Sequence, residues 1–278
     1  MQIKLNDKLL DLSTPVVMGI VNATPDSFFA ESRRTTPAKI LYSVEKIIEE
    51  GGKIIDLGGY SSRPSAENVS EEEEISRLSF ALELILKEFP DVFISVDTFR
   101  AKVARHVVKN YNVAMINDIG GGTLDDNMFN TIAELKVAYV LMHMRGRPQT
   151  MSKLTQYNNL TAEIIAFLEQ RLHQLRALGV HDVIVDPGFG FAKTLEQNYR
   201  LLKELSCFSM LEAPLLVGVS RKSMIYNLLE INPQHALNGT TAVNMLALLG
   251  GTSILRVHDV KEAVETIKIF KVYQNFKP

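Results

Sequence analysis

Eight short apolar runs recur along this chain, and a stretch with helical periodicity follows each of them. The runs are continuous rather than alternating in polarity, which is typical of parallel strands buried on both faces. The runs predicted as strands are 15–22, 53–58, 92–98, 113–118, 137–143, 182–188, 214–220 and 252–258. Strands that alternate with helices indicate repeated βαβ units. This repeat restricts the chain to a parallel sheet flanked by helices.

The helical stretches can be recognised from the spacing of their apolar residues and from their ends. Residues 40–48 carry one apolar stripe, which Gly51 brings to an end. Ser70, with Glu73 three residues later, forms a capping-box pattern ahead of a second stripe. The acidic run 71–74 is interpreted as a solvated first turn that faces the positive end of the helix dipole.

With 278 residues, these units are expected to close as a (β/α)8 TIM barrel, a fold that commonly uses about 250 residues. An open, doubly wound sheet is the structural alternative. Residues 2–12, QIKLNDKLLDL, predict a short β-hairpin ahead of the first barrel strand. No low-complexity linker interrupts the sequence, so residues 1–278 are expected to form a single domain.

Charge and cysteine content restrict the partners and the compartment. The chain has 30 basic and 32 acidic residues, which gives no general electrostatic reason to expect nucleic acid or a membrane surface as partner. Cys207 is the only cysteine, so no intrachain disulfide can form. No apolar run approaches the roughly 18 residues of a membrane span, and the N-terminal residues lack a signal-peptide core. A soluble, cytoplasmic protein is expected.

Polar side chains stand where the predicted strands end. They are Asn22, Ser61, Ser62, Arg63, Asp97, Asn117, Asp118, Asp186, Ser220, Arg221, Lys222, Arg256 and His258. In a barrel the carboxyl ends of the strands converge on one face, where active sites are built. A lone Asp at a strand end is usually a cap or turn residue. Polar groups at seven of the eight ends indicate an enzyme.

The chemistry of these groups indicates two kinds of ligand. Asp97, Asn117 and Asp186 offer acceptor oxygens and one amide, which suit the donor-rich edge of a heterocycle. The cationic donors, which suit phosphate or carboxylate, are Lys222, Arg256 and His258. A neutral heterocycle at one end and an anion at the other describe an activated alcohol that carries pyrophosphate. The sequence has no GxGxxG after a strand, no GxxxxGK[ST], no HExxH and no cysteine cluster, which argues against a Rossmann or P-loop site and against zinc.

Eight motifs, in order, resemble the dihydropteroate synthase family. They are MGIVNATPDSF (18–28), DLGGYSSRP (56–64), SVDT (95–98), INDI (116–119), LMHM (141–144), DPGFGF (186–191), GVSRK (218–222) and RVHDV (256–260). One such motif is only suggestive, whereas eight in the right order are strong. The resemblance implies a transferase of folate biosynthesis that condenses hydroxymethyl-dihydropterin pyrophosphate with p-aminobenzoate to give dihydropteroate and pyrophosphate.

The resemblance also implies roles for individual residues. The residues implied to hold the pterin are Asp97, Asn117, Asp186 and Lys222. Those implied to hold the pyrophosphate are Asn22, Arg63, Arg256 and His258, with Mg²⁺ ligated near Asn22. Those implied to contact the second substrate or the pocket wall are Ser62, Pro64, Phe191 and Ser223. Asp97, Lys222 and Arg63 are carried over as the catalytic residues.

The family reaction is SN1-like, and the resemblance implies the same course here. Pyrophosphate leaves first, the pterin methylene carries the positive charge, and the weakly nucleophilic aniline attacks. Asp97 can stabilise that cation, while Arg256 and His258 stabilise the charge that develops on the leaving group. The resemblance further implies a homodimer formed through the late helices. The last predicted helix supplies an apolar stripe there, although packing on the barrel explains it equally well: Val260, Val264, Ile267 and Phe270.

Two loops depart from the family pattern, and two other functions stay open. The family commonly has SFSDGG where this chain has SFFAES (27–32), so Ala30 replaces a carboxylate. We expect Glu31 to take over part of its role; the alternative is a solvated charge at the loop tip. Tyr60 stands where the family often has Glu, whereas Ser62 in place of Thr keeps the hydroxyl. A pterin-binding methyltransferase barrel is one alternative, but it has no use for an anion site. A noncatalytic pterin-binding homologue is the other.

Overall fold

All eight predicted apolar runs form parallel strands, and these pair in one sheet. The strands are β3 (Val16–Asn22), β4 (Ile54–Gly58), β5 (Phe93–Asp97), β6 (Met115–Asp118), β7 (Ala138–Met142), β8 (Val183–Asp186), β9 (Leu216–Val217) and β10 (Ile254–Val257). Their order in the sheet is β8-β7-β6-β5-β4-β3-β10-β9. A parallel bridge between Val185 and Leu215 joins the two outer strands. The sheet therefore closes into a barrel, and the open-sheet alternative is wrong.

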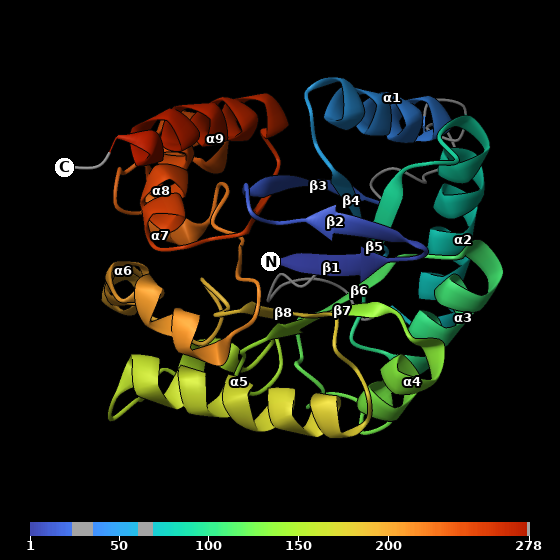
Figure 1. Ribbon diagram of the computed structural model, residues 1–278, viewed down its shortest axis with the longest axis horizontal. Helices are drawn as coiled ribbons and strands as arrows, with labels where there is room; N and C mark the ends of the chain where they lie inside the picture. Colours follow the sequence, from blue (N-terminus) through green and yellow to red (C-terminus); the bar gives the residue numbers. More distant parts are fainter. Residues whose placement is uncertain (24–35, 61–68, 277–278) are drawn as a thin grey trace.

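Helices form a ring around the strands (Figure 1). The computed structural model describes residues 1–23, 36–60 and 69–276. Within these ranges the α-helices are α1 (Thr36–Glu49), α2 (Glu71–Glu88), α3 (Ala101–Tyr111), α4 (Met128–Leu135), α5 (Leu160–Ala177), α6 (Leu195–Lys203), α7 (Ser223–Tyr226), α8 (Leu237–Leu249) and α9 (Val260–Asn275). The strand–helix repeat confirms the predicted TIM barrel. None of the described helices is long and apolar enough to span a membrane.

The predicted N-terminal hairpin is present and closes one end of the barrel. Strands β1 (Gln2–Leu5) and β2 (Lys8–Asp11) pair antiparallel, and the hairpin lies across the centre of the ring in Figure 1. Ile3 and Leu5 are buried among apolar side chains from inside the barrel, including Met18 of β3. The amino-terminal end of the barrel is thus an apolar floor, which leaves the carboxyl end for polar groups.

The start of α2 differs in one respect from the sequence prediction. The Ser70 side chain accepts a hydrogen bond from the backbone N–H of Glu73, as the capping pattern predicts. However, Glu74 is not solvated: it is buried and forms an ion pair with Arg100. Burial raises the pKa of the Glu74 carboxyl, and the nearby Arg100 opposes that rise. The prediction of a wholly solvated acidic turn was therefore wrong, because the fourth residue of the run faces α3.

We expect Gly188→Ala to destabilise the fold far more than Gly179→Ala. Both glycines have a positive φ, +72° and +81°, so each alanine carries the left-handed penalty of about 1–2 kcal/mol. A Cβ at Gly188 would also lie 2.0 Å from the carbonyl oxygen of His143, whereas nothing lies within 4 Å of one at Gly179. Overpacking of this kind adds about 1–3 kcal/mol. Urea unfolding measures both, and equal losses would contradict the close approach.

Candidate active site

The carboxyl ends of four neighbouring strands place polar residues in one row. Asn22 pairs in register with Gly58, Gly58 with Asp97, and Asp97 with Asn117. A Cβ added at Gly58 would lie 3.6 Å from Oδ1 of Asn22 and 3.9 Å from Cβ of Asp97. A larger residue at this position would therefore crowd both neighbours. Three residues predicted from the sequence to belong to the site, Asn22, Asp97 and Asn117, are thus brought together.

Asp118, at the very end of β6, serves a different purpose from its neighbour Asn117. Its carboxylate accepts hydrogen bonds from the backbone N–H groups of Gly120 and Gly122, at 2.7 and 2.8 Å. It also accepts one from the hydroxyl of Tyr139, at 2.5 Å. These contacts hold the glycine loop after β6, so Asp118 supports the mouth of the barrel from within the protein.

Arg256 of β10 reaches across the barrel mouth and joins this row. Its Nη2 donates to Oδ2 of Asp97 at 2.9 Å, and its Nε donates to Oδ2 of Asp56 at 2.6 Å. Asp56 is fully buried, and it also accepts from the Ser95 hydroxyl at 2.7 Å and from Nδ2 of Asn117 at 3.0 Å. The sequence analysis missed Asp56, although a carboxylate inside the apolar run 53–58 was a detectable signal.

Asp97 holds a carboxyl whose charge depends on pH near neutrality. Burial raises its pKa to about 7. The adjacent Arg256 cation acts in the opposite direction, and the Asp56 charge adds to the rise. A carboxyl that is ionised only above this pH, in a barrel mouth, is typical of a residue with a functional role.

Lys222 and Asp186 lie on the other side of the mouth, beside two phenylalanines. The Lys222 ammonium donates to the carbonyl oxygen of Phe189 at 2.6 Å and lies 4.8 Å from the ring centre of Phe191. Loss of hydration lowers the pKa of Lys222 to about 8, and the Asp186 charge opposes that fall. Asp186 is buried and accepts from the backbone N–H of Gly188 at 2.7 Å. This part of the mouth therefore places a cationic donor, Lys222, directly beside an aromatic ring, Phe191.

Lys193 holds the loop that carries Phe191, and the sequence analysis missed it. Its buried ammonium donates to the carbonyl oxygens of Gly188, at 2.8 Å, and Phe191, at 3.0 Å. Nδ1 of His143 lies 3.3 Å away. Burial lowers the pKa of Lys193 to about 7, and burial also lowers that of His143, so the imidazole is neutral. His143 is therefore a buried neighbour of this lysine.

His258 stands just after β10 and is held by Ser220. Its Nδ1 lies 3.1 Å from the Ser220 hydroxyl, and its backbone N–H donates to the same oxygen at 3.2 Å. Loss of hydration and the nearby Arg256 charge lower the pKa of His258. Because Ser220 engages Nδ1, Nε2 is the ring nitrogen left for a ligand.

Arg221 supports this part of the mouth from outside. Its guanidinium forms a two-point ion pair with Asp259, at 2.8 and 2.7 Å, and donates to the carbonyl oxygens of Pro233 and Gln234. All three of its nitrogens are therefore engaged by the protein. Arg221 therefore ties the loop after β9 to the start of α9.

Of the remaining predicted site residues, the structure describes Ser223. Ser223 is exposed at the start of α7, directly after Lys222. Ser62, Arg63 and Pro64, and the altered loop with Ala30 and Glu31, lie outside the described residues. Within the described ranges, no three His, Cys, Asp or Glu side chains gather closely enough to hold a metal ion.

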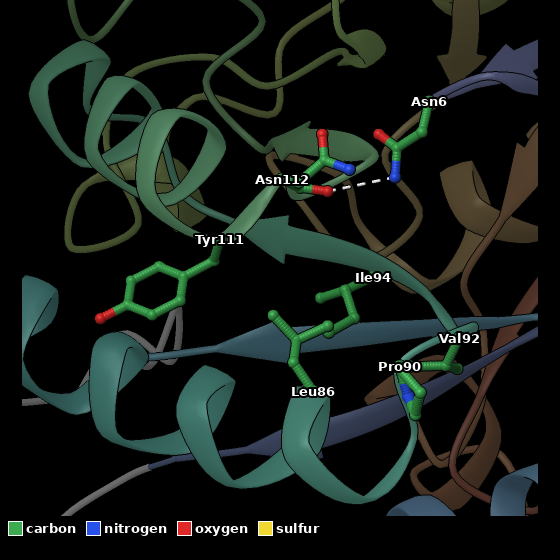
Figure 2. A pocket seen from close by; sticks show the side chains of 7 residues that line it. All are labelled: Asn6, Leu86, Pro90, Val92, Ile94, Tyr111 and Asn112. Carbon is green, nitrogen blue, oxygen red and sulfur yellow. Dashed lines mark hydrogen bonds between the residues drawn. The ribbon is translucent and has the colours of Figure 1, made fainter.

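A separate hollow lies at the opposite end of the barrel (Figure 2). It is lined by Asn6, Leu86, Pro90, Val92, Ile94, Tyr111 and Asn112. Nδ2 of Asn6 donates to the carbonyl oxygen of Asn112 at 3.1 Å, so the hairpin turn itself borders this hollow. Its lining contains no charged side chain, which distinguishes it from the polar mouth.

The fold and the mouth together define a TIM-barrel enzyme with acceptor oxygens on one side of its site and cationic donors beside them. A family model for pterin binding enzymes matches residues 18–258. The dihydropteroate synthase of Haemophilus influenzae is 39% identical over 99% of this chain and 100% of that protein. The Escherichia coli enzyme of the same name is 40% identical over 94% of this chain and 92% of its own.

Solved structures give the same result. A Yersinia pestis dihydropteroate synthase, in complex with a sulfonamide drug, superposes with a TM-score of 0.91 at 37% identity and covers 100% of both chains. A Thermus thermophilus dihydropteroate synthase, in complex with 4-aminobenzoate, has a TM-score of 0.87 at 35% identity and covers 98% of this chain and 99% of that one. This chain belongs to the pterin binding enzymes, and among them to the dihydropteroate synthase family.

We expect kcat/KM to show a bell-shaped dependence on pH. Below a pH of about 7 Asp97 takes up a proton and can no longer stabilise positive charge. Above a pH of about 8 Lys222 loses the proton with which it donates a hydrogen bond. Measurement of kcat/KM through both values tests this. In Lys222→Arg the guanidinium stays charged, so the basic limb should move to higher pH while the acid limb stays. An unmoved basic limb would assign it to another group.

Proposed function

We propose that this chain condenses hydroxymethyl-dihydropterin pyrophosphate with p-aminobenzoate, giving dihydropteroate and pyrophosphate in folate biosynthesis. The observation that carries the proposal is the contact of Arg256 with Asp97 at the barrel mouth, beside Asn117. It places a cationic donor for a leaving group directly beside a carboxylate suited to a carbocation. A cytoplasmic location, which the single cysteine Cys207 favours, is part of the proposal.

The pterin ring is proposed to bind between Asp97, Asn117, Asp186 and Lys222. The three oxygen-bearing side chains accept from the amino and N–H groups of the ring, and Lys222 donates to a ring acceptor. Phe191, beside the Lys222 ammonium, offers an aromatic surface for the flat heterocycle. Such a set would discriminate a pterin from an apolar ring, because its buried polar groups would be left unpaired by the latter.

The pyrophosphate is proposed to bind at Arg256, His258, Asn22 and Arg63. Arg256 and Nε2 of His258 donate to its oxygens and stabilise the negative charge that develops as the C–O bond breaks. The electron pair of that bond leaves with pyrophosphate, so the pterin methylene becomes cationic and the Asp97 carboxylate stabilises it. The aniline nitrogen then forms the new C–N bond and loses a proton.

Mg²⁺ is proposed to accompany the pyrophosphate. The exposed Asn22 offers an amide oxygen, and Mg²⁺ commonly binds through one or two protein oxygens, several waters and substrate phosphates. The donor set therefore fits an ion carried largely by the substrate. Such an ion would help to neutralise charge on the leaving group.

The second substrate is proposed to bind beside Ser62, Pro64 and Ser223. Ser223 is exposed directly after Lys222, so a carboxylate held there would place the aniline near the pterin methylene. Lys222 and Arg63, with Asp97, are the proposed catalytic residues. The partial takeover of the missing loop carboxylate by Glu31 is part of the same proposal.

We expect the purified protein to release pyrophosphate over many turnovers only when p-aminobenzoate and Mg²⁺ are present, because the aniline consumes the cation that departure of pyrophosphate leaves. Coupled detection of pyrophosphate, with and without p-aminobenzoate, measures this.

His258→Ala should raise KM for the pyrophosphate-bearing pterin by about tenfold or more, because a charge-assisted hydrogen bond contributes about 1.5–3 kcal/mol. Its affinity for dihydropteroate, which lacks pyrophosphate, should change little.

Other outcomes of this assay identify the alternatives. Pterin binding without any pyrophosphate release would indicate a noncatalytic homologue. Methyl transfer from a reduced folate to a corrinoid, without pyrophosphate release, would indicate the methyltransferase class. If His258→Ala weakens binding of the pyrophosphate-bearing pterin and of dihydropteroate equally, the variant has a damaged fold and not a lost phosphate contact.

A homodimer through the late helices is also proposed, on a surface that differs from the predicted one. The predicted stripe packs on the barrel, since Val260, Ile267 and Phe270 are buried. The apolar residues that α8, α9 and the residue after α9 leave exposed are Leu246, Leu249, Ile269, Val272, Tyr273 and Phe276. These two helices lie side by side in Figure 1, so the exposed apolar residues come from neighbouring elements.

We expect light scattering to show a dimer that Ile269→Glu converts to a monomer. A carboxylate buried in the interface would lack a partner, which costs several kcal/mol. Leu9→Glu is the matched control, because Leu9 is 67% exposed and Ile269 is 63% exposed, but Leu9 lies on the N-terminal hairpin. A monomeric parent protein, or a control that dissociates equally, would contradict this surface.

A further inference from the structure

Asp56 is the group that connects the two halves of the proposed site. One of its oxygens, Oδ2, accepts from Nδ2 of Asn117 at 3.0 Å and from Nε of Arg256 at 2.6 Å. Its other oxygen, Oδ1, accepts from the Ser95 hydroxyl at 2.7 Å, which holds the carboxylate in one orientation. Asp56 is fully buried, so it acts on a ligand only through its partners.

The contact with Asp56 decides which atom Asn117 offers to a ligand. An amide has a donor end and an acceptor end. A carboxylate only accepts, so the amide can face Asp56 with Nδ2 and not with Oδ1, which would place two acceptors together. Oδ1 of Asn117 is therefore the atom left for the pterin. This is the acceptor that an amino or N–H group of the ring requires.

The same carboxylate orients the Arg256 guanidinium. Nε is held by Asp56, and Nη2 is held by Asp97 at 2.9 Å. Among the contacts of residues 1–23, 36–60 and 69–276, Nη1 is the nitrogen of this group with no protein acceptor. The guanidinium is planar, so two fixed nitrogens fix the direction of the third. Asp56 therefore sets the direction from which an anion can meet Arg256.

We propose that Asp56 is a positioning residue that presents the side-chain oxygen Oδ1 of Asn117 to the pterin and Nη1 of Arg256 to the anion. The inference rests on the proposed function and deepens it. One buried oxygen makes the site specific for a ligand that bears donors at one end and negative charge at the other. Asp56 touches neither end itself.

A double-mutant cycle tests the link between Asp56 and Asn117. Calorimetry measures the Kd of hydroxymethylpterin, which carries no pyrophosphate, for the parent chain, Asp56→Ala, Asn117→Ala and the double variant. Each single variant should bind about tenfold or more weakly, as expected for loss of a buried hydrogen bond. The double variant should bind within about threefold of Asn117→Ala, because Asp56 acts through Asn117. Additive losses, or unchanged affinity in Asp56→Ala, would overturn the proposal.

Two further variants separate positioning from charge and from structural damage. Asp56→Asn keeps an oxygen for Asn117 and Arg256, and its new NH₂ can donate to Ser95, so it should restore affinity to within about threefold of the parent. In Ser95→Ala the two donors to Oδ2, Asn117 and Arg256, still hold the Asp56 carboxylate, so affinity should stay within about threefold of the parent. If Asp56→Asn and Asp56→Ala bind hydroxymethylpterin equally weakly, the proposal is overturned. If thermal unfolding shows Asp56→Ala to be unfolded, Asp56→Leu, which fills the space, replaces it.

The parent chain distinguishes the two levels of inference. If it fails to bind hydroxymethylpterin, the proposed function fails. If it binds and the Asp56 variants bind equally well, the proposed function stands and the positioning role alone fails.

Discussion

The ion pairs of Arg256 with Asp56 and Asp97 are the interaction on which the active site depends. A guanidinium in the mouth of a barrel loses much of its hydration, which is costly unless charges and hydrogen bonds compensate. Here Asp56 and Asp97 do so at 2.6 and 2.9 Å. Two carboxylates share this one cation, so the network of Arg256, Asp56 and Asp97 carries more negative than positive charge whenever Asp97 is ionised. A net negative network suits a site proposed to stabilise a carbocation.

The position of this network follows from the two ends of the barrel. The hairpin of β1 and β2 closes the amino-terminal end with apolar side chains such as Ile3 and Leu5. Charged groups can therefore gather only at the carboxyl end, with an apolar interior beneath them. The low polarity below the mouth raises the pKa of Asp97 and lowers that of Lys222. The fold that positions these groups thus also sets their protonation.

Much of the fold and part of the site could be predicted from residue pattern. Eight apolar runs predicted eight strands, and the polar residues after them predicted which face would be functional. Asp56 was missed because its partner Arg256 lies 200 positions away in the chain. Lys193 was missed because the sequence does not show that its side chain turns inward to the carbonyl oxygen of Gly188. Glu74 was misinterpreted because an acidic run at a helix start looks the same whether its last member faces water or, as here, Arg100.

The sequence by itself determined the strand–helix repeat and the family, because these depend on local periodicity and on motifs that are contiguous in the chain. The closure of the sheet into a barrel rests on the bridge between Val185 and Leu215, which the sequence did not show. Only the tertiary structure decided how the polar ends meet. Asp56 and Arg256 are separated by 200 positions, yet they share a hydrogen bond of 2.6 Å. Tertiary structure also decided which face of α9 stays exposed, since the stripe at Val260 and Phe270 packs on the barrel. Periodicity shows that a helix has an apolar face, but the neighbouring elements decide what that face covers.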